Sequence, residues 1–279
     1  MSKDFDASAK ASARALGFEL REMQGWLCCG AVFTNVTENL ITQAGPSRIL
    51  GRAQAEGSTL ITLCAGCYNV LRRSSQQATC NHIKQDQINA FNEERYEGGV
   101  SVLHLLEILR DTIGFEKIKE AVKAPLQGLQ VGAYYGCLLL RPYREMRLDD
   151  PYRPSIMEKL LVSLGATPID YPSRTECCGS YLGVGSLERA EPMSSSIVQS
   201  ARSCGAKLLV VSCPLCKYNL EVCQSLRTSA ETDFMPVVYF TQLLGLALGL
   251  DPEQLELNSQ QLNAIRGCVQ TTVENVSQQ

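Results

Sequence analysis

Two cysteine arrays of the same shape constrain this chain more than any other feature. Each array is a Cys-Cys-Gly triplet followed by a Cys-x-x-Cys pair, and the arrays consist of Cys28, Cys29, Gly30, Cys64 and Cys67, and of Cys177, Cys178, Gly179, Cys213 and Cys216. Matching cysteines are 149 residues apart, as 28 is from 177 and 64 is from 213. Metal ions and iron–sulfur clusters need thiolates at fixed spacings, whereas apolar packing tolerates drift. The spacing therefore indicates a duplicated metal-binding protein.

The number of cysteines, 13 in 279 residues, allows extracellular disulfides or intracellular thiolate ligands. A chain of this length buries a core without disulfides, the cysteine count is odd, and no export signal opens the sequence. We therefore expect thiolate ligands in a cytoplasmic protein. No apolar run reaches the roughly 18 residues of a membrane span. The net charge is −3 without any basic block, so we expect no nucleic-acid partner.

The similarity of the two halves extends into the residues that flank the cysteines. In each half, apolar periodicity predicts a helix that ends at a glycine, then a short strand, then the Cys-Cys-Gly loop. The predicted helices cover residues 7–16 and 156–164, and the predicted strands cover residues 18–22 and 167–171.

A further strand is predicted before each Cys-x-x-Cys pair, from unalternating apolar runs at residues 59–63 and 208–211. Each pair then opens a helical pattern. The cysteines are therefore expected at strand carboxyl ends, where open α/β sheets place their sites, and at helix N-termini, which stabilise thiolates. The predicted fold class is α/β, with two pseudo-symmetric CCG domains, named after the triplet, that each hold a small parallel sheet flanked by helices.

The second half contains one element more than the first. Residues 129–135 predict a strand that ends at Gly136 and Cys137, and the equivalent first-half position would precede Met1. We expect the first half to lack its opening strand and a fifth cysteine, through a deletion or a wrongly assigned start. Helices are predicted at residues 84–96, 100–113 and 237–248, and the domains at 1–126 (N-terminally truncated) and 127–279.

The number and arrangement of the thiolates indicate which kind of metal centre each half can hold. Adjacent cysteines suit one zinc tetrahedron poorly, because successive side chains diverge, but they can reach different irons of a cluster. The second half, with five thiolates, favours an iron–sulfur cluster. For the first half, with Cys28, Cys29, Cys64 and Cys67, a cluster and zinc both stay open. Disulfide exchange at each Cys-x-x-Cys pair is a third interpretation, which the upstream cysteines disfavour.

Two apolar signatures narrow the interpretation further: GAYYGCLLLRP at residues 132–142 and VVYFTQLLGLALGL at residues 237–250. Together with the repeated cysteine pattern, they make residues 4–257 resemble the B-type subunit of heterodisulfide reductase and its relatives. The resemblance implies a noncubane [4Fe-4S] cluster at each CCG motif and reduction of a mixed disulfide by homolytic S–S cleavage. It implies that one cluster is held by Cys137, Cys177, Cys178, Cys213 and Cys216, and that the remaining ligands of the other are Cys28, Cys29, Cys64 and Cys67.

The resemblance also implies partners: a ferredoxin-like iron–sulfur subunit that feeds electrons, a flavin-containing subunit, and a small disulfide or thiol substrate. The sequence has no GxGxxG motif in a strand-to-helix turn and no P-loop, so electrons are expected to arrive from another protein. Residues 183–185 (Gly-Val-Gly) are predicted as a turn behind the second double cysteine.

Other candidates have ordinary explanations. Cys80, Cys204, Cys223 and Cys268 lack counterparts in the repeat and are expected to be buried apolar side chains or exposed thiols. Arg141, Arg144 and Arg147 are expected on a solvated face, with anionic substrate binding as the alternative. His104 is expected in the interior, and His82 in solvent. For Tyr134 and Tyr135, contact with a cluster sulfur and packing in the core both stay open.

The sequence thus predicts an oxidoreductase subunit that passes electrons from a partner iron–sulfur protein to the second-half cluster and then to a disulfide or related sulfur substrate. The alternative is a non-catalytic electron-transfer or anchoring subunit of a dehydrogenase complex, with zinc in the first half.

Overall fold

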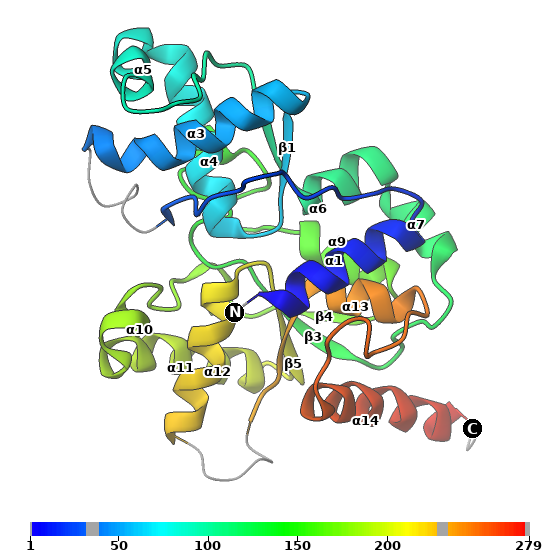
Figure 1. The fold of residues 1–279 in the computed structure, drawn as a ribbon. Coiled ribbons are helices and arrows are strands. Elements are labelled where there is room, and N and C mark those ends of the chain that lie inside the picture. Colours follow the sequence, from blue (N-terminus) through cyan, green and yellow to red (C-terminus); the bar gives the residue numbers. More distant parts are fainter. Residues whose placement is uncertain (1, 32–38, 228–233, 277–279) are drawn as a thin grey trace. The chain divides into compact units, whose positions relative to one another are not determined.

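The chain folds into two compact units, each assembled from separate stretches of sequence. The structure, a computed structural model, describes residues 2–31, 39–227 and 234–276 (Figure 1). Unit 1 comprises residues 1–20, 109–137 and 152–279, and unit 2 comprises residues 21–108 and 138–151. The fold class is α/β, as predicted.

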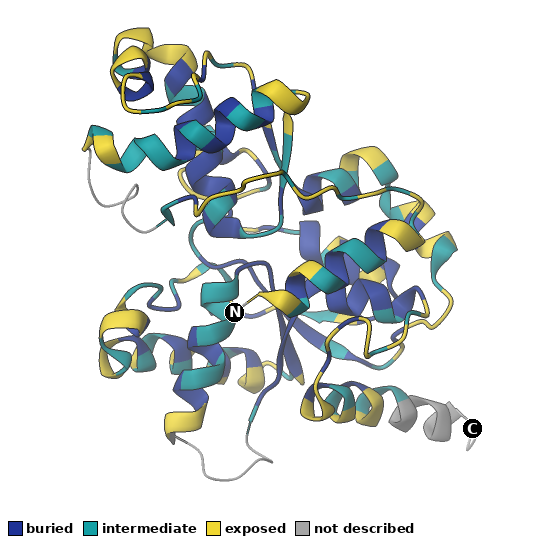
Figure 2. Ribbon diagram, viewed as in Figure 1, coloured by how far each residue is buried: buried dark blue, intermediate teal, exposed yellow. Residues whose placement is uncertain are grey.

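Unit 1 is built on a four-stranded parallel sheet with the strand order β4-β3-β5-β6. The strands are β3 (Gln130–Tyr134), β4 (Thr167–Ile169), β5 (Leu208–Val211) and β6 (Val237–Tyr239). In the central strand, Gly132 is in register with Ile169 on one side and with Leu209 on the other. Every residue of β5 and β6 is buried (Figure 2), which explains their unalternating apolar sequence.

Helices make up most of the remainder of unit 1. Helix α12 packs against α11, and α1 packs against α13. The helices are α1 (Lys3–Ala15), the π-helix η1 (Ile108–Ile113), α7 (Phe115–Ala121), α9 (Ile156–Ser163), the 3-10 helix η2 (Pro172–Thr175), α10 (Leu182–Gly185), α11 (Leu187–Ser203), α12 (Pro214–Arg227), α13 (Phe240–Ala247) and α14 (Ser259–Val276).

Unit 2 holds a parallel pair of strands, β1 (Thr59–Thr62) and β2 (Ser101–His104). Helix α4 packs against β2, and α3 packs against α4 and α5. In β1 only Thr62 is buried, so the expected burial on both faces is wrong for this strand and right for β5. The helices are α3 (Leu40–Glu56), α4 (Ala65–Cys80), α5 (His82–Asn89), α6 (Leu105–Glu107) and α8 (Tyr143–Met146).

The first helix, α1, packs within unit 1, although most of the first sequence half forms unit 2. The Phe5 ring stacks on the Tyr239 ring with centroids 4.0 Å apart, and the Ser8 and Thr241 hydroxyls lie 2.7 Å apart. The compact units therefore cross the predicted boundary between residues 126 and 127. The division into 1–126 and 127–279 remains a prediction about the sequence repeat.

Two predicted helices each begin with a strand. Residues 100–113 form β2, α6 and η1, and residues 237–248 form β6 and α13. In the first case the His104 N–H donates to Glu107 Oε2 at 2.8 Å, and in the second the Tyr239 N–H donates to Gln242 Oε1 at 2.9 Å. These capping bonds fix the helix starts at residues 105 and 240, so the preceding apolar residues extend into the parallel sheets.

Two other predicted elements, one strand and one helix, also differ from those in the structure. Residues 18–22 form no strand, since no neighbouring strand pairs with them among the described residues. The helix predicted at 84–96 is the shorter α5. Just beyond it, the Asn89 side chain accepts the Tyr96 N–H at 3.1 Å and donates to the Tyr96 carbonyl at 3.0 Å. This local hydrogen bonding holds the chain in a loop.

Candidate metal centres

Cys137 and the four cysteines of the second array, together called the second array from here on, lie in unit 1. Four of the five lie in loops that follow the carboxyl ends of its strands, and Cys216 lies in α12. Cys137 follows β3, Cys177 and Cys178 follow β4 and η2, and Cys213 follows β5. Because the strands are parallel, these ends share one edge of the sheet. The same topology places the turn into α12, with Cys216, at that edge.

The thiols of this second array touch one another. Cys137 hydrogen-bonds to Cys177. The Cys178 and Cys216 sulfurs lie 3.5 Å apart, and Cys216 also hydrogen-bonds to Cys213. Cys137 also interacts electrostatically with Cys178 and Cys213, so all five side chains belong to one cluster.

The first array assembles within unit 2 in the same manner. The Cys29 and Cys67 sulfurs lie 3.2 Å apart, and Cys67 also hydrogen-bonds to Cys64. Cys28 is exposed, and its sulfur accepts the Gly30 N–H at 3.5 Å. The second cysteine of the triplet thus meets the second cysteine of the Cys-x-x-Cys pair in both halves.

The triplet glycines shape each loop and bind the first cysteine. Gly30 has φ +65° and Gly179 has φ +87°, in the left-handed region that favours glycine. The Gly179 N–H donates to Cys177, as the Gly30 N–H does to Cys28. A β-carbon at residue 179 would lie 2.8 Å from the Ala190 β-carbon, so α11 leaves no room for a side chain there.

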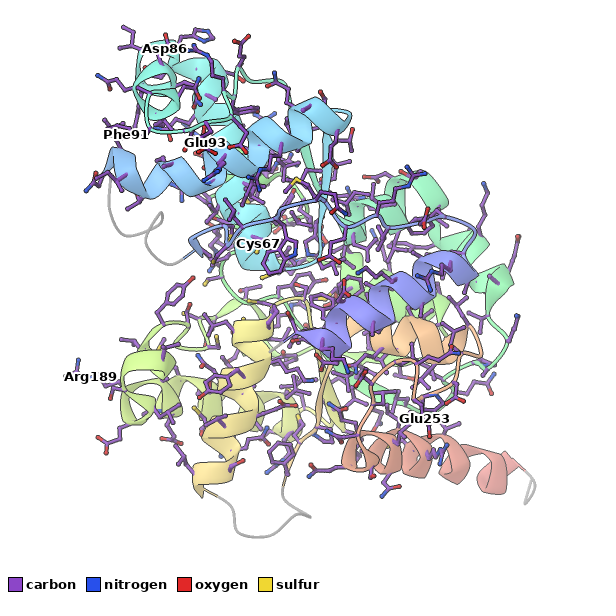
Figure 3. The ribbon with its side chains drawn as sticks, viewed as in Figure 1. Cys67, Asp86, Phe91, Glu93, Arg189 and Glu253 are labelled. Atoms are coloured by element: carbon purple, nitrogen blue, oxygen red, sulfur yellow. The ribbon has the colours of Figure 1, made fainter. Side chains whose placement is uncertain are left out.

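Each Cys-x-x-Cys pair begins a helix. The Cys64 carbonyl accepts the Tyr68 N–H at 2.9 Å, and the Cys213 carbonyl accepts the Lys217 N–H at 3.0 Å. The second cysteine of each pair therefore lies in the first turn of α4 or α12, where Figure 3 labels Cys67. A helix N-terminus carries partial positive charge that stabilises thiolates and anionic clusters.

Asn219, on α12, was not predicted from the sequence and is fully buried. Its amide donates to the Cys178 carbonyl at 3.1 Å and to the Ser180 carbonyl at 2.9 Å, and it lies 3.7 Å from the Cys178 sulfur. The Ser180 N–H approaches the same sulfur at 3.4 Å. The dipeptide Tyr-Asn shortly after both Cys-x-x-Cys pairs was the available sequence signal.

The two tyrosines before Cys137 pack in the interior and bond to protein oxygens. Tyr134 and Tyr135 are each 1% exposed. The Tyr134 hydroxyl donates to the Glu176 carbonyl at 2.8 Å, and the Tyr135 hydroxyl donates to the Glu158 carboxylate. Burial, with the neighbouring thiolates Cys216 and Cys178, raises the pKa of Tyr134. The Tyr134 bond fixes the β3 end against the loop before Cys177, and the Tyr135 bond fixes it against α9.

Hydrogen bonds between the thiols shift the pKa values of the two partners in opposite directions. The hydrogen bond from Cys137 lowers the pKa of Cys177 to about 6, and the same bond raises the pKa of Cys137. Likewise, the bond between Cys178 and Cys216 lowers the pKa of Cys178 and raises that of Cys216. The array therefore favours partial ionisation, which suits thiolate ligands.

None of the thirteen cysteines, all of which lie in the described ranges, forms a disulfide. Within the same ranges, no group of three or more His, Cys, Asp or Glu side chains is arranged to hold a single metal ion. A search of these residues also finds no helix with the length and apolar character of a membrane span.

The remaining candidates lie away from the arrays or on the surface. His104 is buried, its Nδ1 accepts the Leu106 N–H at 3.2 Å, and His82 is exposed. Residues 182–185 form the single-turn helix α10 in place of the predicted turn. Arg141, Arg144, Arg147, Cys80 and Cys204 are exposed, Cys223 is buried and Cys268 is half-buried.

The sequence matches the family described as CCG, cysteine-rich domain, at residues 2–72 and 131–221. It is 32% identical over 264 residues to the 8-methylmenaquinol:fumarate reductase membrane anchor subunit of Wolinella succinogenes, covering 93% of this chain and 92% of that protein. It is 30% identical over 270 residues to the B-type subunit of the ferredoxin/F(420)H(2)-dependent CoB-CoM heterodisulfide reductase of Methanosarcina acetivorans, covering 94% and 88%.

Among solved structures, the chain resembles a hypothetical protein from Helicobacter pylori with a TM-score of 0.73 and 14% identity. The likeness covers 93% of this chain and 49% of that one, so this chain spans about half of that protein's length. At this identity the likeness concerns the fold alone. The sequence matches, which cover both cysteine arrays, carry the assignment: the chain belongs to the family of heterodisulfide reductase B-type subunits, which are CCG cysteine-rich domain proteins.

Proposed function

We propose that this protein is an iron–sulfur oxidoreductase subunit whose second array, Cys137, Cys177, Cys178, Cys213 and Cys216, holds a noncubane [4Fe-4S] cluster. The observation that carries the proposal is the convergence of five thiols at one sheet edge of unit 1. Backbone and side-chain N–H groups are directed at their sulfurs. Such a donor set suits an anionic sulfur-ligated cluster.

The residues of the site have separable roles. The five cysteines would be the ligands, and an iron–sulfur cluster held there would supply one-electron transfer. Gly179 and Ser180 present N–H groups to the Cys177 and Cys178 sulfurs, and Asn219 holds the loop that carries them. Cys178 is only 2% exposed, so water is largely excluded from that side of the array.

The first array, Cys28, Cys29, Cys64 and Cys67, is proposed as a second centre of either iron–sulfur or zinc type. Three of its thiols, those of Cys29, Cys64 and Cys67, repeat contacts of the second array, which supports a cluster. The number of cysteines in this array, four, equals that of a structural zinc site and supports zinc, whereas the described side chains are not arranged around a single metal ion.

The reaction we propose is reduction of a disulfide or a related sulfur substrate. Reduction of a disulfide consumes two electrons and two protons, breaks the S–S bond and yields two thiols. The Methanosarcina relative is named as part of a ferredoxin/F(420)H(2)-dependent heterodisulfide reductase, which supports a ferredoxin-like iron–sulfur partner. The flavin-containing subunit is proposed from the family resemblance alone. We place this reaction in the cytoplasm.

A second candidate function is electron transfer or anchoring without substrate chemistry, in a dehydrogenase-type complex. It is supported by the Wolinella relative, which is named as a membrane anchor subunit of a fumarate reductase. The names of the heterodisulfide reductase relatives support the first candidate. The two functions differ in whether sulfur substrate reacts on this chain.

The experiment is turnover by the complex purified anaerobically with its native partners. Disulfide is supplied with a reduced low-potential donor, and thiol release is followed with a chromogenic reagent. Thiol production that is lost in Cys178→Ser, together with a substrate-dependent change of the EPR signal, supports disulfide reduction. Reduction of the clusters without any thiol release contradicts it and supports the second candidate.

A further inference from the structure

The segment that follows Cys137, residues 138–151, belongs by its contacts to unit 2, which contains the first array. Cys137 itself belongs to unit 1. The peptide bond from Cys137 to Leu138 is therefore a point where the chain leaves one unit and enters the other. The hydrogen bonds that join this segment to helix α4 lie within unit 2.

Helix α4, which begins at the Cys-x-x-Cys pair of the first array, binds this segment through main-chain carbonyls. The Asn69 amide donates to the Leu138 carbonyl at 2.7 Å and to the Arg141 carbonyl at 2.6 Å. Farther along the segment, the Tyr68 hydroxyl donates to the Met146 carbonyl at 3.2 Å and Arg72 Nε donates to the Glu145 carbonyl at 2.8 Å. Because the acceptors are main-chain carbonyls, these side chains fix the position of the backbone of the segment.

Asn69 is the α4 residue that binds the segment nearest to Cys137. It comes two residues after Cys67, and its first acceptor comes one residue after Cys137. Its side chain is fully buried, and its two acceptors mark the ends of a four-residue turn. Loss of the amide would leave two carbonyls without this donor and free the turn that begins at residue 138.

Asn219, the asparagine that follows the second Cys-x-x-Cys pair, binds a different part of the chain from Asn69. Asn219 comes three residues after Cys216, one position later than Asn69 relative to Cys67. One residue turns a helix by roughly 100°, so the two amides leave their helices in different directions. Asn219 binds its own Cys-Cys-Gly loop, whereas Asn69 binds the segment that follows the fifth cysteine of the other array. The two are not repeats of one structural role.

In both asparagines the side-chain oxygen has no hydrogen-bond partner among the described residues. Each acts as a donor through its amide nitrogen. An aspartate in the same place preserves the shape but replaces the donor by a carboxylate that faces the two carbonyls, so both Asn69→Asp and Asn69→Ala lose the hydrogen bonds.

We infer that Asn69 is a positioning residue that links the two cysteine arrays, because it ties the start of the first array's helix to the chain immediately after Cys137. A change at the α4 start then reaches Cys137 through one amide and one peptide bond. The tether itself follows from unit 2 alone, and its consequence for the second-half centre rests on the proposed function.

The test uses the full chain, purified anaerobically, as wild type, Asn69→Ala, Asn69→Asp and Tyr68→Phe. Hydrogen exchange followed by mass spectrometry reports the peptide covering residues 137–142. The Asn69 variants are expected to exchange there roughly tenfold faster. Tyr68→Phe, which loses a hydrogen bond at the far end of the segment, is expected to leave that peptide unchanged. Asn69→Ser, which retains one donor, is expected to be intermediate and serves if the other variants misfold.

The second readout is the EPR spectrum and midpoint potential of the second-half centre, compared with the thermal midpoint of the whole protein. A shifted spectrum or potential in the Asn69 variants, with none in Tyr68→Phe at equal thermal loss, supports the link. Unchanged exchange at residues 137–142 overturns the tether, and faster exchange with an unchanged spectrum overturns the link to Cys137. If wild type carries no iron, the proposed function fails while the exchange result still decides the tether.

Discussion

The buried amide of Asn219 binds the Cys178 loop at three points: the Cys178 carbonyl at 3.1 Å, the Ser180 carbonyl at 2.9 Å and the Cys178 sulfur at 3.7 Å. One side chain on α12 therefore holds both the position of a proposed ligand and the electrostatic environment of its sulfur. N–H groups directed at ligand sulfurs stabilise the more negative, reduced state of an iron–sulfur centre.

Replacement of Asn219 by alanine is expected to lower the midpoint potential of the second-half centre. It should also lower the free energy of unfolding by about 2–3 kcal/mol, since buried carbonyls lose their donor. An EPR-monitored redox titration measures the first effect, and thermal unfolding measures the second. The control is Gln224→Ala on the same helix, which loses hydrogen bonds to Leu220 and Met235 away from the cysteines. Equal potentials in the two variants would refute the role of Asn219.

Gly179→Ala is expected to destabilise unit 1 and empty the second array. Its φ of +87° disfavours any β-carbon, and that carbon would lie 2.8 Å from the Ala190 β-carbon and 2.9 Å from its α-carbon. We expect a loss of about 2–4 kcal/mol in the free energy of unfolding. Gly185→Ala is the control, because a β-carbon there meets nothing within 4 Å. Iron content together with the thermal midpoint checks both variants, and a stable, fully loaded Gly179→Ala protein would rule this account out.

Glu221, on α12, should make stability depend on pH. Burial raises its pKa to about 7, with Asp4 acting in the same direction and Lys217 opposing it. A carboxyl whose folded pKa lies above its unfolded value favours the folded state at low pH, and this contribution is lost as pH rises through about 7. Between about pH 5 and pH 8 we expect a loss of about 2–3 kcal/mol that Glu221→Gln removes.

Thermal midpoints of wild type and Glu221→Gln across this pH range measure the effect. Exposed Glu116, replaced by glutamine, is the control in the same unit. Parallel pH profiles of wild type and Glu221→Gln would show that burial of this carboxyl has no such consequence.

Two cysteines in unit 1 are expected to differ completely in function. Cys178→Ser should remove the iron and the EPR signal of the second array, because it replaces a proposed ligand. Cys223→Ser should retain both, although Cys223 is also fully buried, since its hydrogen bond is to Ser194 and its interaction with Cys178 is electrostatic only. Iron analysis and EPR of the two variants decide the matter. Loss of iron in Cys223→Ser would mean that the ligand set is wrongly assigned.

The sequence predicted best those features that local spacing and composition determine. The strand at 208–211, the glycine ends of α1 and α9, and the helices after each Cys-x-x-Cys pair are all found. The strands β2 and β6 were missed because short apolar runs fit a buried helix or a buried strand equally well. The capping pairs His104–Glu107 and Tyr239–Gln242 contained the missing boundary signal.

The rest depends on tertiary contacts that no local pattern encodes. Packing of α1 in unit 1 rests on the stacking of Phe5 on Tyr239, residues that are far apart in the sequence. The roles of Asn69 and Asn219 differ through a one-residue shift on similar helices. The 149-residue offset of the repeat places Asn69 opposite Tyr218, so the alignment predicts neither role. The cysteine residues were identified from their spacing, whereas the residues that orient them required the structure.

The central claim is that the cysteines of the second array act together as ligands of inorganic iron. The most direct measurement is the content of iron, acid-labile sulfide and zinc per chain in anaerobically purified protein, with Mössbauer spectroscopy of the iron. We predict iron and sulfide in nearly equal amounts, with loss of the second-half component in Cys178→Ser. Protein that carries zinc alone, or no metal at all, would contradict the account.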